Sequence, residues 1–368
     1  MSSPVYFINL RATMKENLLD KLERLLTTAG IGTAVSKRDL VAVKLHFGEL
    51  GNAAFIRPIY LRKVVETIKA VGGSPFLTDA NTLYSGTRSD SPQHLTTAIQ
   101  NGFAYPVVEA PLIIADGLRG KSETAVAIAQ KHFKEAFIGN DIVEADALVS
   151  VAHFKGHELS GFGGTIKNLG MGCASRRGKL AQHSSLSPKV KRKKCIGCGD
   201  CEDHCSQQAI AMIEEKAVID PEKCIGCGEC ILICAQAAIQ IQWNQSVPIF
   251  MENMVEYTLA VLKGKENKSL FVNFITNVSP ACDCYPTNDA PLVRDIGILA
   301  SKDPVAIDQA SVDFVNKEPA LADSCLKTHT GPGEDKFMGV YPKVDWRRQL
   351  EYAEQIGLGS REYTIETL

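Results

Sequence analysis

Two near-copies of one cysteine pattern lie in the middle of this chain and constrain its fold more than any other feature. The first copy runs from Cys195 to Cys205 (CIGCGDCEDHC), and the second runs from Cys224 to Cys234 (CIGCGECILIC). In each copy, three cysteines spaced to bind one iron–sulfur cubane are followed by a fourth, which reaches the cubane of the other copy. The repeat therefore predicts two [4Fe–4S] clusters and a chain that transfers electrons.

The spacing also assigns the eight ligands. The predicted sets are Cys195, Cys198, Cys201 and Cys234 for one cluster, and Cys224, Cys227, Cys230 and Cys205 for the other. A structural zinc site would use two well-separated CxxC pairs, and a disulfide framework would need an oxidising compartment. The proline that usually follows the fourth cysteine is replaced by Ser206 and Ala235, which leaves the ligands unchanged. The glycines expected to adopt special backbone conformations and aim amides at cluster sulfur are Gly197, Gly199, Gly226 and Gly228.

The chain as a whole is too long to be a ferredoxin alone. Its 368 residues carry a formal net charge of −2 and are 45% hydrophobic, which gives no case for a nucleic-acid partner and is typical of a globular protein. No apolar run approaches the roughly 20 residues of a membrane span, and residues 1–10 lack the basic start of a signal peptide. Since the cysteines have no export signal, we expect a reducing, cytoplasmic location.

The predicted organisation is discontinuous. Residues 188–245, called the cysteine-rich segment from here on, are expected to form a small α+β insert like a bacterial ferredoxin, with short strands at 217–219 and 239–242. Residues 1–187 and 246–368 alternate strands with helices, which predicts one α/β domain with three layers and a mostly parallel sheet. Strands are expected over 5–10, 40–45, 76–79, 147–152, 270–275 and 296–299, and helices are expected to begin at Pro58, Pro248 and Pro304.

Polar residues stand at the ends of several of these strands. They are His46, Asp79, His153 and Asn277. In open α/β sheets, ligands bind outside the carboxyl ends of the strands. The coincidence predicts an active site at that edge of the sheet.

The stretch from His153 to Cys173 is dense in glycine and in reactive side chains. Its glycines can bring the backbone close to a ligand, but it lacks the GK[ST] ending of a Walker A loop and does not follow the dinucleotide fingerprint. His153 and His157 have the spacing of a metal pair on a helix, whereas Gly156 argues against a helix there. Each histidine is therefore as readily a structural hydrogen-bonding residue as a ligand.

Four cysteines remain outside the repeat: Cys173, Cys282, Cys284 and Cys325. Cys282 and Cys284 lie one residue apart after the strand expected at 270–275, a spacing that suits a soft metal or a redox pair. Cys173 could complete a third metal or cluster site with them, and His157 or His183 could supply a further ligand. The alternative is a set of reduced, partly buried cysteines without metal.

Charge is divided sharply around the repeat. Residues 176–194 carry basic side chains and no acidic ones, whereas residues 200–229 are mostly acidic. A basic collar beside a cluster could steer an acidic redox partner or an anionic substrate. A solvated linker into the cysteine-rich segment is the alternative.

Several phrases of the chain resemble one known family. They are HFKGH (153–157), GFGGTIKNLGMGC (161–173), TDANTLYSGTR (78–88), IIADGL (113–118) and SKDPVAIDQAS (301–311). They resemble the family built on the domain of unknown function 362, in the branch that carries an inserted two-cluster ferredoxin module. The resemblance implies cytoplasmic iron–sulfur proteins, common in anaerobes, and transfers the eight cluster cysteines without implying a reaction. The other residues within family motifs are His46, Lys155, His157, Lys167, Cys173, Cys282 and Cys284.

Three functions are compatible with these features. In the first, the protein is an oxidoreductase whose clusters relay low-potential electrons to a substrate or metal site in the α/β domain, with His46, Lys155, His157 and Lys167 as candidate catalytic residues. In the second, it is a non-catalytic electron-transfer or docking subunit of a larger redox complex. In the third, it is a metal or cluster maturation factor. No nicotinamide or flavin fingerprint is present, so the expected partner is a ferredoxin, flavoprotein or dehydrogenase, and self-association stays open.

Overall fold

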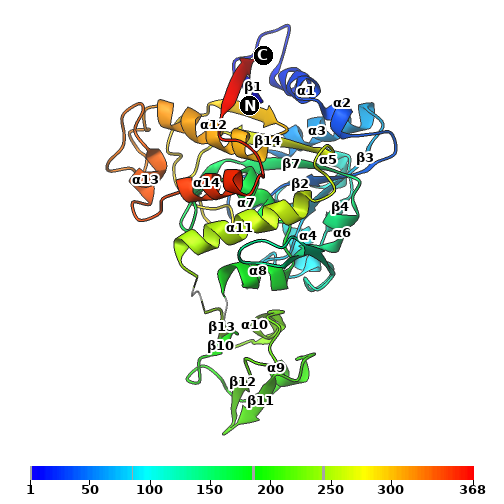
Figure 1. Ribbon diagram of the computed structural model, residues 1–368, viewed down its shortest axis with the longest axis vertical. Helices are drawn as coiled ribbons and strands as arrows, with labels where there is room; N and C mark the ends of the chain where they lie inside the picture. The colour runs from blue at the N-terminus through cyan, green and yellow to red at the C-terminus, as the bar shows by residue number, and fades with distance from the viewer. Residues whose placement is uncertain (1, 85, 185–186, 243–244) are drawn as a thin grey trace.

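The computed structural model describes residues 2–84, 86–184, 187–242 and 245–368. Its centre is an eight-stranded sheet (Figure 1). In the order in which they lie side by side, the strands are β16 (Tyr363–Thr367), β1 (Ser3–Asn9), β15 (Gly297–Ser301), β14 (Ser269–Ile275), β7 (Ala147–His153), β2 (Leu40–Lys44), β3 (Ser74–Asp79) and β4 (Leu112–Ile114). Ser85, in the motif at 78–88, lies outside the described residues.

The sheet is mostly parallel, as the alternation of strands and helices predicts. Strands β14, β7, β2, β3 and β4 run parallel to one another, and β16 is parallel to β1. Strand β15 is the exception, because it pairs antiparallel with both β1 and β14. The residues of β7 and β14 are all buried, which explains their nearly continuous apolar sequences.

Helices cover both faces of the sheet. Neighbouring residues of β7 show the division, because Leu148 packs into one buried apolar core and Val149 into the other. The helices of the Val149 side are α1 (Leu18–Thr28), α2 (Ile31–Ala34), α3 (Pro58–Ala70), α4 (Ser91–Gln100) and α5 (Tyr105–Val108). Those of the Leu148 side are α6 (Asn140–Glu144), α7 (Thr165–Gly170), α11 (Val247–Leu262), α12 (Pro304–Lys317), α13 (Lys336–Val340) and α14 (Arg347–Gln355).

Local sequence signals explain where these helices begin. Asp303 caps α12, since its carboxylate accepts hydrogen bonds from the amides of Val305 (2.8 Å) and Ala306 (3.0 Å). Pro304 follows at the first helical position, and α3 likewise begins with Pro58. The helix expected from Pro248 begins one residue earlier, at Val247. Two hairpins complete the α/β part: β5 (Glu123–Ala127) with β6 (Glu135–Gly139), and β8 (Lys155–His157) with β9 (Gly161–Gly163).

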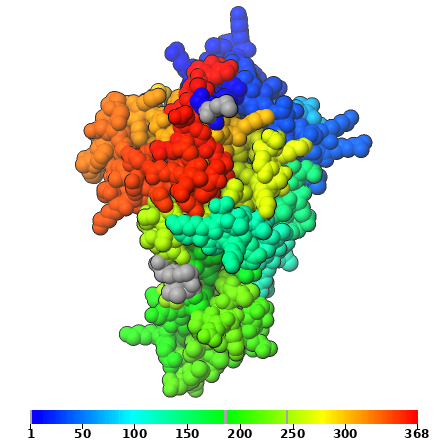
Figure 2. Space-filling model, viewed as in Figure 1, coloured from blue at the N-terminus to red at the C-terminus, as the bar shows by residue number. Residues whose placement is uncertain are grey.

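The cysteine-rich segment lies between α8 (Arg176–His183) and α11, and it projects from the rest of the chain in Figures 1 and 2. Its elements are β10 (Lys189–Val190), α9 (Asp200–Asp203), β11 (Ile210–Ile213), β12 (Lys216–Ile219), α10 (Glu229–Ile233) and β13 (Ile239–Gln240). Strand β10 pairs with β13, and β11 pairs with β12. The short strands expected near 217 and 239 are therefore present. Residues 185–186 and 243–244, beside the expected boundaries of this segment, lie outside the described residues.

A small apolar core holds the cysteine-rich segment together. It contains Cys201, Ile210, Ala217, Ile231 and Ile239. Leu83 and Leu180, from the α/β part, complete the same core, so the two parts share buried apolar contacts. Across the described residues, no helix is both long enough and apolar enough to pass through a membrane.

Candidate functional site

Four side chains meet at the edge of the sheet where β2 and β14 end. His46 follows β2, and Cys282 and Cys284 lie in the loop after β14. Lys167, on α7, completes the group, which we call the thiol site. Among the described residues, the ligand atoms of His46, Cys282 and Cys284 lie within 4.8 Å of one another, close enough to hold a metal ion. The strand order explains the meeting, because β7 alone separates β2 from β14.

The two sulfurs of the thiol site form an unequal pair. The Cys282 thiol donates to the Cys284 sulfur over 2.9 Å. This hydrogen bond lowers the pKa of Cys284 well below its usual value, against the effect of burial, and Lys167 and His46 lower it further. The same bond, together with burial, raises the pKa of Cys282 well above its usual value. Cys284 is thus the thiolate, and Cys282 keeps its proton.

Positive charge stands directly beside this pair. The Lys167 ammonium lies 3.3 Å from the Cys282 sulfur. Burial acts to lower the pKa of Lys167, but its interactions with the two sulfurs, first that of Cys282 and then that of Cys284, outweigh burial and raise that pKa above its usual value. Lys167 is therefore a firmly charged partner of the two sulfurs.

The hydrogen bonds of His46 fix its tautomer. Its Nδ1 accepts a hydrogen bond from the Gly48 amide (2.9 Å). The ring proton of the neutral imidazole consequently resides on Nε2, which lies 3.4 Å from the Cys284 sulfur. Burial, and then the charge of Arg88, lower the pKa of His46. A neutral His46 therefore directs an N–H group at the thiolate.

Asp283, between the two cysteines, anchors their loop. Its buried carboxylate contacts His153 Nδ1 at 3.0 Å and the Lys155 ammonium at 2.9 Å. Burial acts to raise the pKa of Asp283, but His153 and Lys155 lower it far below its usual value. The Lys155 side chain is thus directed at Asp283 and helps to hold the loop, and a catalytic role for Lys155 stays a prediction.

Gly156 lets the HFKGH motif approach the same loop. A Cβ atom at this position would lie 2.0 Å from the Pro280 carbonyl oxygen. The Gly156 amide also donates to the Ser279 carbonyl over 2.8 Å. Because Gly156 lies in β8, His153 and His157 do not share a helix face, as the glycine predicts.

His157 lies apart from the three grouped ligand atoms. Its Nδ1 contacts the Ser160 hydroxyl at 2.8 Å. Burial, and then the charge of Lys167, hold its pKa well below the usual value. His183, the other histidine considered as a further ligand, is stacked against the ring of Phe250, with ring centroids 4.8 Å apart. For His183, burial and then Lys167 lower the pKa to about 3. Either histidine as a further ligand stays a prediction.

Cys173 belongs to a different environment from Cys282 and Cys284. It is fully buried in the apolar core on the Leu148 side of the sheet. Burial raises its pKa to about 12, although the Lys44 ammonium opposes this. The group with ligand atoms within 4.8 Å therefore contains His46 in place of Cys173. A metal site that includes Cys173 stays a prediction.

The cysteine-rich segment encloses a cavity lined by Cys195, Cys198, Cys201 and Cys234. These thiols come from both copies of the repeat. Burial raises the pKa of Cys201, and the thiols of Cys234, Cys195 and Cys198 add to the rise. A cubane binds each thiolate to a different iron, so its four ligands line a space instead of converging on one point. This cavity fits that requirement.

The second copy gathers the complementary set around Cys230. Burial raises the pKa of Cys230 strongly, and the next causes are the thiols of Cys227 and Cys224. Cys201 and then Cys205, both from the first copy, contribute less to the same rise. The thiols of the second copy and Cys205 therefore fit an iron–sulfur cubane, as do the thiols that line the cavity of the first copy.

Backbone geometry repeats between the two copies. The glycines with positive φ, as expected from the sequence, are Gly197 (75°), Gly199 (85°), Gly226 (72°) and Gly228 (71°). The amide of Ala209 donates to the Cys205 sulfur (3.3 Å), and the amide of Ala238 donates to the Cys234 sulfur (3.2 Å). Amides directed at ligand sulfur stabilise thiolates and tune a bound cluster.

Of the two alternatives for residues 176–194, the exposed basic collar does not hold for Arg176 and Lys179. Arg176 is fully buried, and its guanidinium donates to the carbonyls of Thr82, Ser89 and Arg119. Lys179 is buried as well. Both side chains are bound inside the fold, because α8 packs them against the α/β part instead of exposing them.

An ion-pair cluster joins the cysteine-rich segment to the α/β part. Glu229, at the start of α10, is buried and contacts Arg119 at 3.0 Å and Lys121 at 3.2 Å. Gly228 beside it packs closely on Arg176 and Leu83, since an added Cβ would lie 3.1 Å and 3.2 Å from them. The second cysteine copy is therefore in direct contact with the α/β part.

Sequence reasoning missed a buried polar group beside the thiol site. The Tyr84 hydroxyl donates to the Cys284 carbonyl (3.1 Å) and accepts from the Arg88 guanidinium (2.8 Å). Arg88 also contacts Glu49 (3.1 Å) and Asp79 (3.4 Å). The signal was the motif at 78–88, which holds three of these residues.

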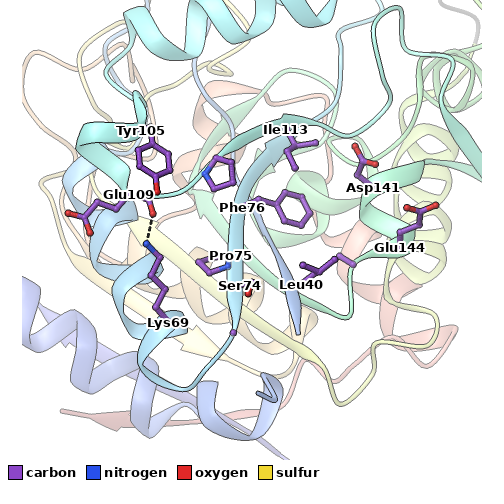
Figure 3. Close-up of a pocket in the computed structure, with 13 residues that line it drawn as sticks. Leu40, Lys69, Ser74, Pro75, Phe76, Tyr105, Glu109, Ile113, Asp141 and Glu144 are labelled. Atoms are coloured by element: carbon purple, nitrogen blue, oxygen red, sulfur yellow. Dashed lines mark hydrogen bonds between the residues drawn. The ribbon is translucent and has the colours of Figure 1, made fainter. Parts of the chain in front are cut away.

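A further pocket lies at the opposite edge of the sheet, where the strands begin. Figure 3 shows this pocket, with a volume of about 470 Å³, lined by Leu40 and Ser74 at the starts of β2 and β3. Tyr105 and Glu109 border it on one side and Asp141 on another. No cysteine lines it, so it is separate from the thiol chemistry.

Comparison with known proteins identifies a family. Residues 41–313 match the family described as Domain of unknown function (DUF362). The chain belongs to this family. No curated protein matches it. Among solved structures, the DUF362 chain is similar to the lactate racemase apoprotein from Thermoanaerobacterium thermosaccharolyticum, with a TM-score of 0.41 and 15% identity. The match covers 74% of this chain and 50% of that chain, and at this level it transfers no activity.

Proposed function

We propose that this DUF362 protein is an iron–sulfur oxidoreductase. In this proposal the cysteine-rich segment is a ferredoxin-like insert in an α/β domain formed by residues 1–187 and 246–368. It holds two [4Fe–4S] clusters, which when bound supply one-electron transfer, commonly at low potential. The electrons pass to the thiol site in the α/β domain.

One observation carries this proposal. The cavity lined by Cys195, Cys198, Cys201 and Cys234 takes three thiols from one copy and the fourth from the other, as two-cluster ferredoxins do. The contact between the second copy and the α/β part, through Gly228 and Leu83, supports a direction for the electrons, namely from the exposed first copy inward. Cys198 is the exposed cysteine of the set, and an external redox protein would dock beside it.

The experiment is anaerobic reconstitution of the full chain, followed by iron and sulfide analysis and by electron paramagnetic resonance after reduction. About eight irons per chain and signals of two interacting reduced cubanes are expected. Iron well below that amount would refute the proposal. Clusters that reduce while the thiol site neither changes redox state nor binds metal would leave an electron-transfer subunit instead. A metal ion bound at the thiol site and released to a partner would favour a maturation factor.

A further inference from the structure

The distance between the two sulfurs of the thiol site argues against a shared metal ion. Two thiolates on one tetrahedral ion lie about 3.7 Å apart, given metal–sulfur bonds of ~2.3 Å. Cys282 and Cys284 place their sulfurs 2.9 Å apart. This separation is shorter than a shared ion requires, and the two side chains face each other directly.

The neighbours of the sulfurs argue the same way. His46 would bind a metal through Nε2, but Nδ1 already accepts the Gly48 amide and leaves the ring proton on Nε2. The Lys167 ammonium, 3.3 Å from the Cys282 sulfur, would repel a cation placed there. Both groups instead stabilise negative charge on sulfur.

We propose that Cys282 and Cys284 are a redox-active pair that reduces small disulfides, cycling between the dithiol and an intramolecular disulfide. The proposal rests on the proposed function, because the electrons that restore the dithiol come from the clusters of the cysteine-rich segment. It goes beyond that function by naming the reacting atoms and the class of substrate.

The exposure of the two cysteines assigns their roles. Cys284 is partly exposed and Cys282 is buried. The Cys284 thiolate attacks one sulfur of the substrate disulfide, the substrate S–S bond breaks, and one substrate thiolate leaves. The Cys282 sulfur, which loses its proton in this step, then attacks Cys284 and releases the second substrate thiolate. The products are a Cys282–Cys284 disulfide and two substrate thiols, which take up the proton of Cys282 and one proton from solvent. A small substrate is favoured because the site is only partly open.

Reduction of the pair closes the cycle. The Cys282–Cys284 bond accepts two electrons and breaks. The Cys282 sulfur takes up one proton from solvent and Cys284 is left as the thiolate, which regenerates the starting pair. Lys167 and the Nε2–H of His46 lie beside the sulfurs and stabilise the charge that develops there.

Two consecutive residues link the clusters to this pair. Leu83 packs in the apolar core of the cysteine-rich segment, against Gly228 of the second copy. Tyr84, the next residue, donates its hydroxyl proton to the Cys284 carbonyl over 3.1 Å. A short path of covalent bonds and close contacts therefore leads from the second cysteine copy to the thiol site.

The first test follows the cysteines by mass spectrometry. Trypsin releases residues 269–294 as one peptide, with Cys282 and Cys284 as its cysteines, because no Lys or Arg lies between Lys268 and Arg294. The anaerobically reconstituted full chain is treated with cystamine, a small disulfide, and then alkylated. The wild-type peptide is expected to lose two hydrogen atoms and its reactivity toward the alkylating agent. The Cys282→Ser variant is expected to trap a mixed disulfide at Cys284, and Cys284→Ser is expected to form none.

The second test counts electrons. After cystamine treatment and its removal, a stepwise titration with a low-potential one-electron donor should consume two more electrons per chain in the wild type than in Cys284→Ser. Cys325→Ser, which leaves the pair intact, should match the wild type. The peptide should return to the dithiol form over the same titration.

The outcomes separate the two proposals. If the protein has its full iron content but peptide 269–294 remains a dithiol in the presence of cystamine, the proposal of a redox pair is refuted. The proposal of two clusters is then unaffected. If the wild type binds one equivalent of a metal other than cluster iron, and Cys284→Ser loses that metal, the redox pair is refuted in favour of a metal site. Low iron content is a separate measurement, and it would overturn the proposed function itself.

Discussion

The Tyr84 hydroxyl donates a hydrogen bond to the backbone carbonyl of Cys284 over 3.1 Å, across 200 positions of sequence. The same hydroxyl accepts from the Arg88 guanidinium at 2.8 Å. Arg88 is itself buried and paired with Glu49 and Asp79. The Tyr84 side chain thus connects the loop that touches the cysteine-rich segment to the loop that carries the thiols.

Replacing Tyr84 by Phe should weaken this connection. The substitution removes the donor to the Cys284 carbonyl and an acceptor of the buried Arg88, and each unsatisfied buried group costs about 1–3 kcal/mol. We expect a loss of the free energy of unfolding in that range, measured by denaturant titration. Tyr105→Phe is the control, because Tyr105 is 61% exposed and its substitution should change stability little. Equal effects of the two substitutions would contradict the connection.

Asp283→Asn should destabilise the protein more strongly. The neutral amide would leave the Lys155 ammonium buried without its ion pair, and breaking a buried pair on one side costs about 3–5 kcal/mol. Asp289→Asn, at an exposed position in the same loop region, is the matched control. Denaturant unfolding of both variants checks the prediction, and a loss below about 1 kcal/mol for Asp283→Asn would show that the pair does not anchor the loop.

The strands could be predicted closely because they are buried. The expected range 147–152 became β7 (Ala147–His153), and 270–275 became β14 (Ser269–Ile275). Strands covered on both faces show as nearly continuous apolar runs ended by turn residues. The direction of β15 could not be predicted in this way, because a local apolar pattern does not specify which strand it pairs with or in which sense.

The composition of the candidate site was predictable only in part. Polar residues at strand ends pointed to His46 and to the loop of Cys282 and Cys284, and the strand order brings them together. That order is a long-range property, so the sequence suggested Cys173 as the companion of the two cysteines, with His157 or His183 as a further ligand, and did not suggest His46. The glycine-rich stretch instead leads Cys173 into the apolar core. The Tyr84 contact was missed for the same reason, since hydrogen bonds between distant loops leave no periodic signal.

His183 should make stability depend on pH. Burial lowers its folded-state pKa to about 3, whereas an unfolded histidine titrates near 6.5. Between these values the unfolded chain binds the extra proton, so stability is complete above about pH 6.5 and falls as the pH decreases. From pH 7 to pH 5 the loss due to His183 is about 2 kcal/mol.

Comparison of wild type with His183→Gln isolates this effect. Both proteins are unfolded anaerobically by denaturant at pH 7 and at pH 5, and the wild type should lose about 2 kcal/mol more than the variant. His329→Gln, at an exposed position, should keep the pH dependence of the wild type. Parallel curves for wild type and His183→Gln would show that His183 titrates normally in the folded state.

Lys167→Gln should slow the reaction of Cys284 with alkylating agents at neutral pH. The hydrogen bond from Cys282 is the largest cause of the low pKa of Cys284, and Lys167 lowers it further. Without the ammonium the pKa rises, and each unit of rise reduces the thiolate about tenfold once the pKa exceeds the working pH. The folded protein is alkylated at a series of pH values, and the reaction is followed in the tryptic peptide 269–294. The pH profile of the alkylation rate should shift to higher pH in Lys167→Gln. Lys167→Arg, which keeps the charge, should restore most of the wild-type profile.

Cys234→Ala and Cys205→Ala give the sharpest test of ligand exchange between the copies. If each copy completes the cluster of the other, Cys234→Ala should spare the cluster of Cys224, Cys227 and Cys230 and damage the one at Cys195, Cys198 and Cys201. Each variant should then retain about four irons per chain in place of about eight, and the magnetic interaction between reduced clusters should disappear. Cys325→Ala should keep the full iron content, since Cys325 lies outside both sets.

The site that loses iron is identified by which cysteines become reactive toward alkylation. In Cys234→Ala these should belong to the first copy, because the amide of Ala238 holds the Cys234 sulfur at the cavity lined by Cys195, Cys198 and Cys201. Reactive cysteines in the second copy would mean that each copy instead binds its cluster with its own four thiols.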